Sequence, residues 1–305
     1  MKALFVVNPA AGHGRGRSRW ELARARASAL WPKHDVAVTE RPGHGRELAR
    51  AAILNGTELV VAVGGDGTLG EVVDGYLSVP ERARMGAALA TLPAGSGCDF
   101  ARHMGVPREP GAWADAMAAG RRQWFDAALA SFRTNDGVLR SRHFMNVAAL
   151  GLAGDVAIGV EKRGKALGGT LTYFLEGLLA VARARPRRMK LVVDGRVEAP
   201  SDYHMVAAAN TSTIGGGMKI APEADAGDGL LEVLTVGALS RPELLRLMPT
   251  IYAGGHVGAS GVVVRRARRL EVFSEESLPL NIDGDLDGVT PAVFEALPKA
   301  ISFLL

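Results

Sequence analysis

The sequence lacks several features that would point to a secreted, membrane-spanning or fibrous protein. It holds one cysteine, Cys98, in 305 residues, so no disulfide can form within the chain, and this usage fits a reducing compartment. No apolar run reaches the roughly 20 residues that a membrane span requires, and the nearest, 167–182, is interrupted by Glu176. The short apolar start, 1–8, predicts a strand and no secretion signal. We therefore expect a cytoplasmic protein.

The sequence also lacks the strong positive charge that is typical of nucleic-acid-binding proteins. The net charge is +4, and aromatic residues make up 6% of the chain, so we expect no nucleic-acid partner. Two arginine clusters, 183–188 and 265–269, allow two interpretations. They are either the solvated ends of a helix and a strand or a peripheral contact with anionic lipid head groups.

The length and the order of elements predict two domains. Up to about residue 92, strands alternate with helices: strands at 2–8, 35–39, 59–63 and 87–92, with helices at 17–30, 44–54 and 69–76. Such an order predicts an α/β domain over 1–126, with a parallel sheet covered by helices on both faces. From 127 to 305 short strand-like segments dominate, with helices near 171–183 and 241–253. This part predicts a β-rich, antiparallel second domain.

A glycine-rich turn follows the buried strand at 59–63. Its residues are Gly64-Gly65-Asp66-Gly67-Thr68, and helical spacing resumes at Leu69. A strand-to-helix turn of this kind presents backbone N–H groups that a phosphate can approach closely, although glycines also occur in purely structural turns. Because a carboxylate beside phosphates needs a cation between them, Asp66 indicates a Mg²⁺-dependent polyphosphate site.

A second turn of the same type follows the strand at 87–92. Gly95, Ser96 and Gly97 precede a helix whose first turn contains Asp99, so Ser96 can donate to a phosphate. Ligands of parallel sheets bind at the carboxyl ends of the strands. Asn8 and Thr39 also follow strands, so we expect one cleft to collect all of these residues.

Two acidic turns lie in the second half of the chain. Asp225 and Asp228 stand three residues apart in a glycine-rich segment, which one interpretation takes as a plain turn. With a carbonyl such as that of Leu230 they could instead hold one hard cation. In the segment 281–288, Asp283-Gly284 is the standard signal of a hairpin tip.

The segment 60–102 resembles the catalytic region of the diacylglycerol kinase family, which includes bacterial lipid kinases, sphingosine kinases and ceramide kinases. The resemblance is carried by the GGDGT motif at 64–68 and by the run from Pro93 to Arg102, and it extends over nearly the whole chain. It implies a fold like that of NAD kinases and diacylglycerol kinases. Three positions depart from the family pattern: Ser96 replaces threonine, Cys98 replaces asparagine, and Gly70 replaces asparagine.

The resemblance also implies roles for individual residues. Asp66, Asp99 and Asp126 are implied to form a carboxylate network that holds Mg²⁺ and its waters. Asp225, Asp228 and the carbonyl of Leu230 are implied to hold a structural Mg²⁺. The nucleotide-binding residues implied are Asn8, Pro9, Ala10, Ala11, Gly12, Thr39, Gly64, Gly65, Asp66, Gly67, Thr68, Leu69, Gly70, Gly95 and Ser96.

The family's proton acceptor lies in an Asp-Gly-Glu motif, which here reads Asp283-Gly284-Asp285. Asp285 is therefore the expected base, with Asp283 as its neighbour or substitute. Its side chain is shorter than glutamate by one bond of about 1.5 Å. A misplacement of that size can reduce the rate on the order of 10²-fold unless the backbone compensates.

The expected function is Mg²⁺-dependent phosphoryl transfer from ATP to a lipid hydroxyl. The helix near 171–181, with Tyr173 and Phe174, either covers an acyl chain or is an ordinary buried helix. Two alternatives stay open: a soluble-metabolite kinase of the NAD kinase type, and a nucleotide-binding regulator that has lost turnover. The acceptor lipid and the oligomeric state, a homodimer among the possibilities, are not specified by the sequence.

Overall fold

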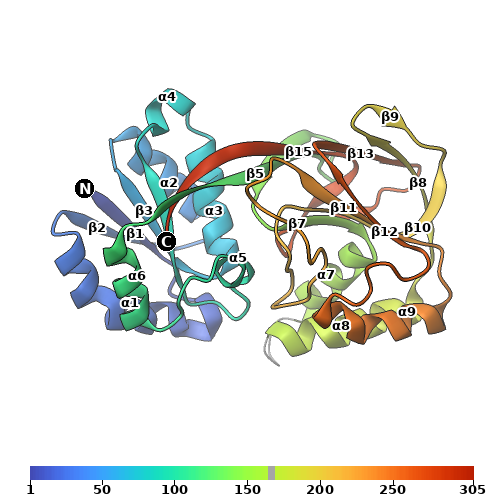
Figure 1. Cartoon of the computed structure of the whole chain (residues 1–305), viewed down its shortest axis with the longest axis horizontal. Helices are drawn as coiled ribbons and strands as arrows, with labels where there is room; N and C mark the ends of the chain where they lie inside the picture. Colours follow the sequence, from blue (N-terminus) through green and yellow to red (C-terminus); the bar gives the residue numbers. More distant parts are fainter. Residues whose placement is uncertain (164–168) are drawn as a thin grey trace. The chain divides into compact units, whose positions relative to one another are not determined.

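A computed structural model describes residues 1–163 and 169–305, which form two compact units. Unit 1 comprises 1–125 and 299–305, and unit 2 comprises 126–298. Two strands, β5 (Arg122–Arg133) and β15 (Asp285–Leu304), carry the chain from one unit into the other (Figure 1). We describe each unit by itself.

The last seven residues differ from the sequence-based division, which placed them in the second domain. They belong to unit 1 because Phe303 pairs in parallel with Leu89. The ring of Phe303 also packs against Phe100 and Phe125, at centroid distances of 5.2 and 6.2 Å. Burial of these three rings against one another favours the return of the chain end to unit 1.

Unit 1 contains the predicted parallel sheet. Its strands are β1 (Ala3–Val7), β2 (His34–Val38), β3 (Leu59–Gly64) and β4 (Ala88–Pro93), in the order β2-β1-β3-β4. Each neighbouring pair is parallel, and β3 and β4 are buried at every residue. A strand buried on both faces reads as a continuous apolar run, which is the pattern seen at 59–63.

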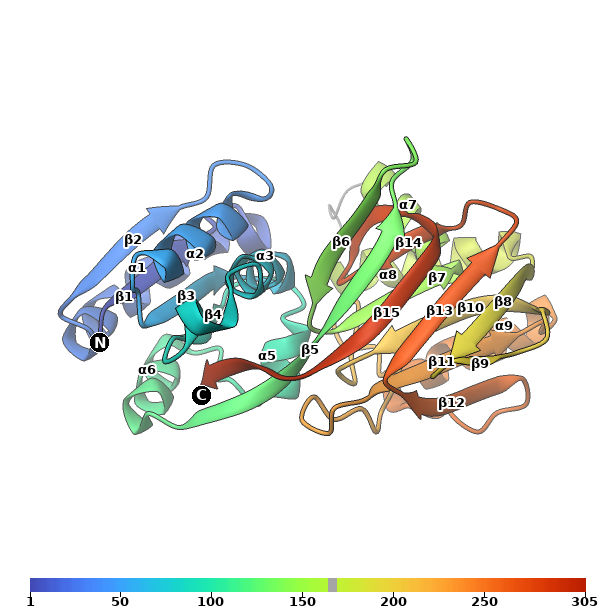
Figure 2. The same ribbon diagram turned by 90° about the horizontal axis from the view of Figure 1, so that it is seen from above.

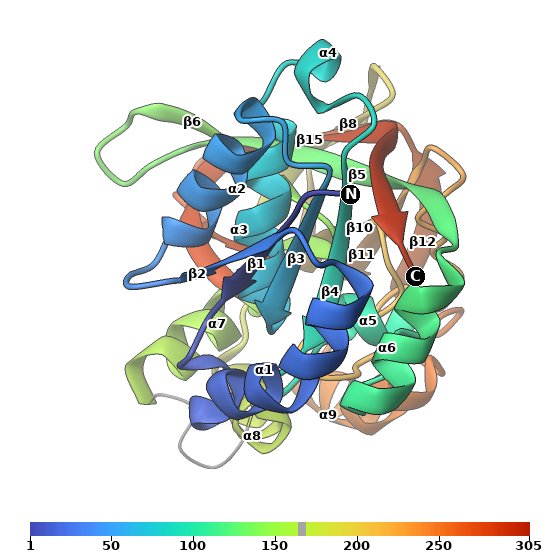
Figure 3. The ribbon, with the colours of Figure 1, turned by 90° about the vertical axis from the view of Figure 1, so that its left-hand side faces the viewer.

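Helices cover both faces of this sheet, as predicted. Helices α2 and α3 pack together on one face, and α1 and α6 on the other (Figure 3). The helices of unit 1 are α1 (Ala11–Leu30), α2 (His44–Leu54), α3 (Asp66–Leu77), α4 (Glu81–Arg84), α5 (Asp99–His103) and α6 (Pro110–Ala119). The first turn of α1 is irregular, because Gly12, His13 and Gly14 have positive φ.

Unit 2 is rich in antiparallel strands, as predicted. One layer has the order β6-β5-β15-β13-β8 (Figure 2), and a second has the order β12-β11-β10-β7-β14. The pairs β8–β10 and β14–β15 join the layers. The strands not yet delimited are β6 (Leu139–Phe144), β7 (Val147–Gly151), β8 (Arg187–Val193), β9 (Arg196–Val197), β10 (Ser201–Ala209), β11 (Leu231–Gly237), β12 (Val262–Ala267), β13 (Arg269–Ser274) and β14 (Pro279–Ile282).

Two hydrophobic cores lie on opposite faces of the second layer. In β10, Val206 and Ala208 belong to the core between the layers, whereas Met205 and Ala207 belong to the core beneath the helices. This alternation follows from the two-residue period of a strand. The helices are α7 (Leu152–Arg163), α8 (Gly169–Arg183), α9 (Arg241–Leu247) and the 3₁₀ helix η1 (Met248–Ala253).

Helix α7 was not predicted, and the strand expected over 262–273 is divided at Arg268 into β12 and β13. Among the described residues, no helix is long and apolar enough to cross a membrane.

Candidate active site

The first glycine turn joins β3 directly to α3. Gly65 is the N-cap in an extended conformation, and Asp66 is the first helical residue. A Cβ atom added at Gly64 would lie under 3.0 Å from the side chain of Thr68. The Thr68 hydroxyl in turn accepts a hydrogen bond from Asn8 Nδ2 at 2.9 Å. The turn is therefore compact because Gly64 has no side chain.

The second glycine turn packs backbone against backbone on the first. The N–H groups of Ala94 and Gly95 donate to Gly64 O at 2.7 and 3.2 Å. A Cβ atom added at Gly95 would lie under 3.0 Å from Gly65 Cα. Only glycine permits this approach, so the structure brings the two predicted phosphate turns together.

The loop after β1 joins the same group. Asn8 Oδ1 accepts the N–H of Ala10 at 3.0 Å, which fixes the turn that contains Pro9 and precedes Ala11. A Cβ atom added at Gly12 would lie under 3.0 Å from Ala94 O, and Gly12 has φ +58°. The predicted residues of 8–12, 64–70 and 95–96 thus gather at the carboxyl ends of β1, β3 and β4.

Glu71 is a residue of this region whose role was not predicted from the sequence. Its carboxylate accepts the N–H of Gly43 at 2.7 Å and that of Gly45 at 2.9 Å. Glu71, which lies in α3, therefore accepts hydrogen bonds from unpaired N–H groups at the N-terminus of α2. Helix α2 has no side-chain cap of its own. Thr39, five residues before α2, continues the sheet through a bond from its N–H to Val7 O at 2.9 Å.

Asp66 and Asp99 lie at the starts of successive helices. Asp66 Oδ1 accepts the N–H of Phe100 at 3.2 Å, which ties α3 to α5. Asp99 is buried and forms an ion pair with Arg102 at 2.7 Å. Arg102 and Arg108 also donate to backbone carbonyls of the second turn, at Gly97 and Gly95 respectively. The two carboxylates are thereby held at the same edge of the sheet.

The three departures from the family pattern differ in their surroundings. Ser96 is partly exposed, and Gly70 is buried within α3. Cys98 is buried in the left-handed conformation, with φ +53°. Burial, and next the negative charge of Asp66, raise the pKa of the Cys98 thiol to about 11, so it stays protonated at neutral pH. Its sulfur lies 3.5 Å from Gly95 O.

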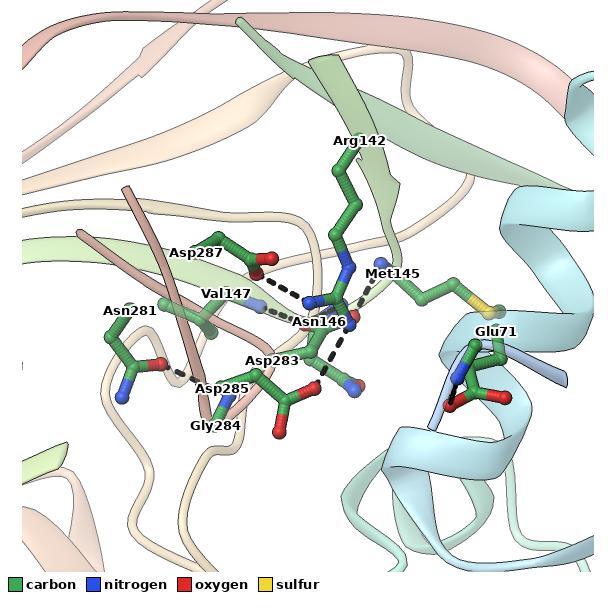
Figure 4. A network of polar contacts seen from close by, with 11 residues as sticks. Glu71, Arg142, Met145, Asn146, Val147, Asn281, Asp283, Gly284, Asp285 and Asp287 are labelled. Atoms are coloured by element: carbon green, nitrogen blue, oxygen red, sulfur yellow. Dashed lines mark hydrogen bonds and ion pairs between the residues drawn. The ribbon is translucent and has the colours of Figure 1, made fainter. Parts of the chain in front are cut away.

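In unit 2 the predicted hairpin tip is confirmed. Asp283 and Gly284 form a two-residue turn between β14 and β15, with φ of +51° and +97°. The Asp283 carboxylate accepts three backbone N–H groups, from Met145 at 3.0 Å, Asn146 at 2.9 Å and Val147 at 3.0 Å (Figure 4). Burial raises the pKa of Asp283 to about 6, while these N–H groups oppose the increase.

Asp285, the expected base, is held by an arginine that the sequence did not single out. Arg142 of β6 contacts Asp285 Oδ2 through Nη2 at 3.1 Å, and its Nη1 contacts Asp287 Oδ2 (Figure 4). Burial alone would lower the pKa of Arg142, but the carboxylates of Asp287, Asp285 and Asp283 raise it above its ordinary value. Asp285 therefore faces a permanent positive charge, whereas Asp283 is occupied by the backbone.

Asp126 belongs to unit 2 and is tied to the acidic turn. Its N–H donates to Ala226 O at 2.7 Å, and its carboxylate accepts the N–H of Gly229 at 2.6 Å. Asp126 is completely buried. Its predicted network with Asp66 and Asp99 stays a prediction.

Asp225 and Asp228 have an arrangement compatible with a hard cation. Each uses Oδ1 to accept a backbone N–H, from Gly227 and Leu230 respectively, and Oδ2 of Asp228 also lies 3.9 Å from Arg266 Nη1. Two carboxylates and the Leu230 carbonyl are oxygen ligands of the kind that Mg²⁺ takes. Within the described ranges, no three His, Cys, Asp or Glu side chains could share one metal ion, so a Mg²⁺ bound here needs backbone oxygens or water as further ligands.

An apolar cavity of about 140 Å³ lies beneath the helices of unit 2. Helix α8 contributes Phe174, Gly177 and Val181 to its lining. That this helix covers an acyl chain stays a prediction. The Tyr173 side chain lies outside the described residues. The remaining lining residues are Leu152, Ala153, Val156, Met205, Ile214, Met218, Ile220, Val236, Leu244, Leu247, Met248, Ile251, Tyr252, His256, Val262 and Asn281.

The two arginine clusters are largely paired with carboxylates. Pairing lowers their net charge, which favours the structural interpretation over a lipid head-group site. The pairs are Arg185–Glu276, Arg187–Asp155, Arg188–Asp202, Arg265–Glu198, Arg266–Glu232, Arg269–Glu271 and Arg269–Glu295.

This fold defines a class, the proteins with the architecture shared by NAD kinases and diacylglycerol kinases. A putative diacylglycerol kinase from Bacillus anthracis superposes with a TM-score of 0.81 at 24% identity, over 99% of this chain and 96% of that one. Yeast NADH kinase complexed with NADH superposes with a TM-score of 0.52 at 13% identity, over 99% and 82% of the respective chains.

Sequence comparison then identifies the family. Residues 2–130 match the diacylglycerol kinase catalytic domain, and residues 147–305 match the YegS C-terminal NAD kinase beta sandwich-like domain. The diacylglycerol kinase of Mycobacterium tuberculosis is 35% identical, over 99% of this chain and 94% of that protein. The diacylglycerol kinase of Bacillus subtilis is 26% identical, over 100% and 96%. The chain therefore belongs to the diacylglycerol kinase family, and it is a kinase.

Proposed function

We propose that this kinase transfers the γ-phosphoryl group of ATP to the hydroxyl of a lipid in a Mg²⁺-dependent reaction. The observation that carries the proposal is the position of the apolar cavity in unit 2. Asn281 lines the cavity, and its Oδ1 accepts the N–H of Gly284 at 3.0 Å. The cavity therefore adjoins the hairpin that carries Asp283 and Asp285.

The chemistry of the cavity favours a lipid over a soluble nucleotide. Its lining is almost entirely aliphatic or aromatic, and apolar cavities of about 150 Å³ stay dry and bind molecules of benzene size. A short segment of an acyl chain has this character. NAD would place phosphates and ribose hydroxyls against groups that offer few hydrogen bonds.

The phosphate-binding part of the proposal rests on unit 1. The turns at 64–68 and 95–97 present backbone N–H groups where α3 and α5 begin, and such groups attract phosphate oxygens. Asn8 Nδ2 fixes Thr68 at 2.9 Å, which keeps the first turn in shape. A Mg²⁺ ion bound near Asp66 and Asp99 would neutralise phosphate charge when present, whereas an ion bound by Asp225 and Asp228 would have a structural role.

The acceptor part rests on Asp285, whose carboxylate would take the proton of the lipid hydroxyl. Asp285 is the more exposed of the two hairpin aspartates, so a substrate can reach it. Asp283 supports it by fixing the turn through the backbone of 145–147. General-base assistance of this kind contributes about 10²- to 10⁴-fold to a rate.

The proposed lipid substrate implies contact with a membrane surface, and α8 and α9 offer it. Phe174, Leu175 and Leu178 of α8 are exposed by 36%, 36% and 42%, and Leu245 of α9 by 42%. Residues 174 and 178 share one face of the helix. Phe174 also lines the cavity, so this exposed apolar surface continues into the proposed acyl site.

The acceptor test compares substrates. Purified protein with ATP and Mg²⁺ should phosphorylate diacylglycerol or another hydroxyl-bearing lipid in mixed micelles, and should leave NAD unmodified. Transfer to NAD without transfer to any lipid would identify a soluble-metabolite kinase. Absence of all transfer, with ATP still bound, would identify a regulator.

The cavity test uses Val156→Phe, which places a larger side chain in the lining. We expect the KM for a long-chain lipid to rise about tenfold, because lost burial of one or two methylenes has this effect, while the KM for ATP stays unchanged. The control is Ile158→Phe on the same helix, which does not line the cavity. An unchanged lipid KM in Val156→Phe would argue against an acyl site here.

A further inference from the structure

We infer that Arg142 is the positioning residue of the hairpin that carries Asp283 and Asp285. Its contact allows the aspartate at 285 to act as the base where the family pattern has glutamate. The inference rests on the proposed function, because it concerns how Asp285 is presented to an acceptor hydroxyl. Arg142 itself touches no reacting atom in this scheme.

The geometry is that of one guanidinium between two carboxylates. Arg142 projects from β6, while Asp285 and Asp287 project from β15, 143 and 145 residues later in the chain. Nη2 contacts Asp285 Oδ2 at 3.1 Å, and Nη1 contacts Asp287 Oδ2 (Figure 4). A guanidinium is planar and its N–H directions are fixed. The ion pair with Asp287 therefore sets the direction from which Arg142 contacts Asp285.

Burial strengthens the ion pair between Arg142 and Asp287. The Arg142 side chain is 16% exposed and that of Asp287 is 23% exposed, whereas Asp285 is 56% exposed. The anchoring pair is thus shielded from water, while the aspartate that should meet the substrate remains accessible. An exposed ion pair alone would be weak, but an arginine fixed by a second carboxylate loses less freedom when it binds Asp285.

The short side chain of Asp285 explains why it needs the contact with Arg142. Asp285 is one bond of about 1.5 Å shorter than glutamate, so it has less reach and tolerates less displacement. Its Oδ2 is committed to Arg142, which leaves Oδ1 to accept the proton of a hydroxyl. Asp283 cannot readily replace it, because three backbone N–H groups occupy its carboxylate.

The guanidinium also separates like charges. The carboxylates that act on Arg142 are Asp287 and Asp285 of β15 and Asp283 of the turn. Removal of the guanidinium would leave these three carboxylates without the cation that they share, so the position of Asp285 would no longer be fixed by an opposite charge.

The experiment measures lipid phosphorylation by the full chain with Arg142→Met, Arg142→Lys, Asp287→Asn and Asp285→Asn. Arg142→Met should lower kcat about 10²-fold, with the KM for ATP unchanged. Arg142→Lys keeps the charge but loses the two-pronged contact, so it should restore only part of the lost kcat. Arg140→Met is the matched control, an exposed arginine two residues away on β6.

A double variant separates positioning from a structural role. In the Asp285→Asn background, Arg142→Met should cause little further loss, because the two residues act as a unit. An equal loss in both backgrounds would overturn the inference, as would a wild-type kcat in Arg142→Met. If Arg142→Met fails to fold, Asp287→Asn and Arg142→Lys provide the same comparison.

The outcome for the proposed function is distinguishable. If the wild-type protein phosphorylates only NAD, the lipid proposal fails, and the Arg142 series is measured with NAD. A 10²-fold loss of kcat there would still support the positioning role, and an unchanged kcat would overturn it.

Discussion

The two units form their candidate functional groups in different ways. In unit 1 the turns after β1, β3 and β4 contribute mainly backbone atoms, and each turn is continuous in sequence. In unit 2 the Asp283 carboxylate meets N–H groups 136 to 138 residues earlier, and Arg142 meets carboxylates on β15. A site built from backbone atoms can be recognised in the sequence by its glycines. A network of side chains joins residues that are far apart in the sequence and that only the fold brings together.

The difference predicts distinct sensitivities. In unit 1 the turns should not tolerate a Cβ atom where backbone packs on backbone, as at Gly95. In unit 2 the hairpin should respond to changes of charge and pH. Three measurements test this contrast, from the largest expected effect to the smallest.

The largest effect concerns Asp283. Its pKa is about 6 in the folded state, above the ordinary value of 3.8, so the native protein holds a proton that the unfolded chain releases between about pH 4 and pH 6. The stability of unit 2 relative to that of Asp283→Asn should therefore fall by about 3 kcal/mol as pH rises through this window. The free energy of unfolding of unit 2 is measured in urea, with amide hydrogen exchange in β14 as the probe.

The control for this pH dependence is Asp136→Asn in the same unit. A hydrogen bond from Thr134 lowers the pKa of exposed Asp136, so its contribution has the opposite sign and is lost as pH falls. If the Asp283 contribution also rises with pH, the three N–H groups outweigh burial and the carboxylate is ionised throughout.

The second effect concerns the contact between glycine turns. Gly95→Ala would force Gly65 and Gly95 apart, since the new Cβ would lie under 3.0 Å from Gly65 Cα. We expect unit 1 to lose about 1–3 kcal/mol, the usual result of overpacking, together with weaker ATP binding. All four tryptophans, Trp20, Trp31, Trp113 and Trp124, belong to unit 1, so their fluorescence reports its unfolding.

Gly67→Ala is the matched control, because a Cβ atom there would meet nothing within 4 Å. It should leave the free energy of unfolding of unit 1 close to that of the wild-type protein. Equal losses in the two variants would show that the turn is sensitive to any substitution, and the contrast between the units would fail.

The smallest effect concerns Cys98, the residue with positive φ between the second turn and α5. Asparagine adopts this left-handed conformation more readily than other non-glycine residues, so Cys98→Asn should stabilise unit 1 by about 0.5–1 kcal/mol. Cys98→Ser, which lacks that preference, serves as the control. Tryptophan fluorescence in denaturant measures both, and a gain in the serine variant alone would contradict the conformational explanation.

Several elements could be predicted from local pattern. The buried strands of unit 1 appeared as apolar runs bounded by glycine, and the Asp283-Gly284 turn carried the standard hairpin signal. Helix α6 was missed although Glu109, Pro110 and Gly120 mark its two ends. Helix α7 was missed because it follows β7 with no polar break in the apolar pattern.

The sequence by itself determined where the glycine-rich turns lie, the alternation of strands and helices, and the family to which the motifs belong. These features depend on backbone conformation and on periods of two or 3.6 residues, which are local properties. Only the tertiary structure decided that Glu71 satisfies α2, that Asp126 binds the acidic turn, and that Arg142 holds Asp285. These contacts join residues far apart in the chain, and their partners are chosen by strand pairing and packing rather than by any local pattern.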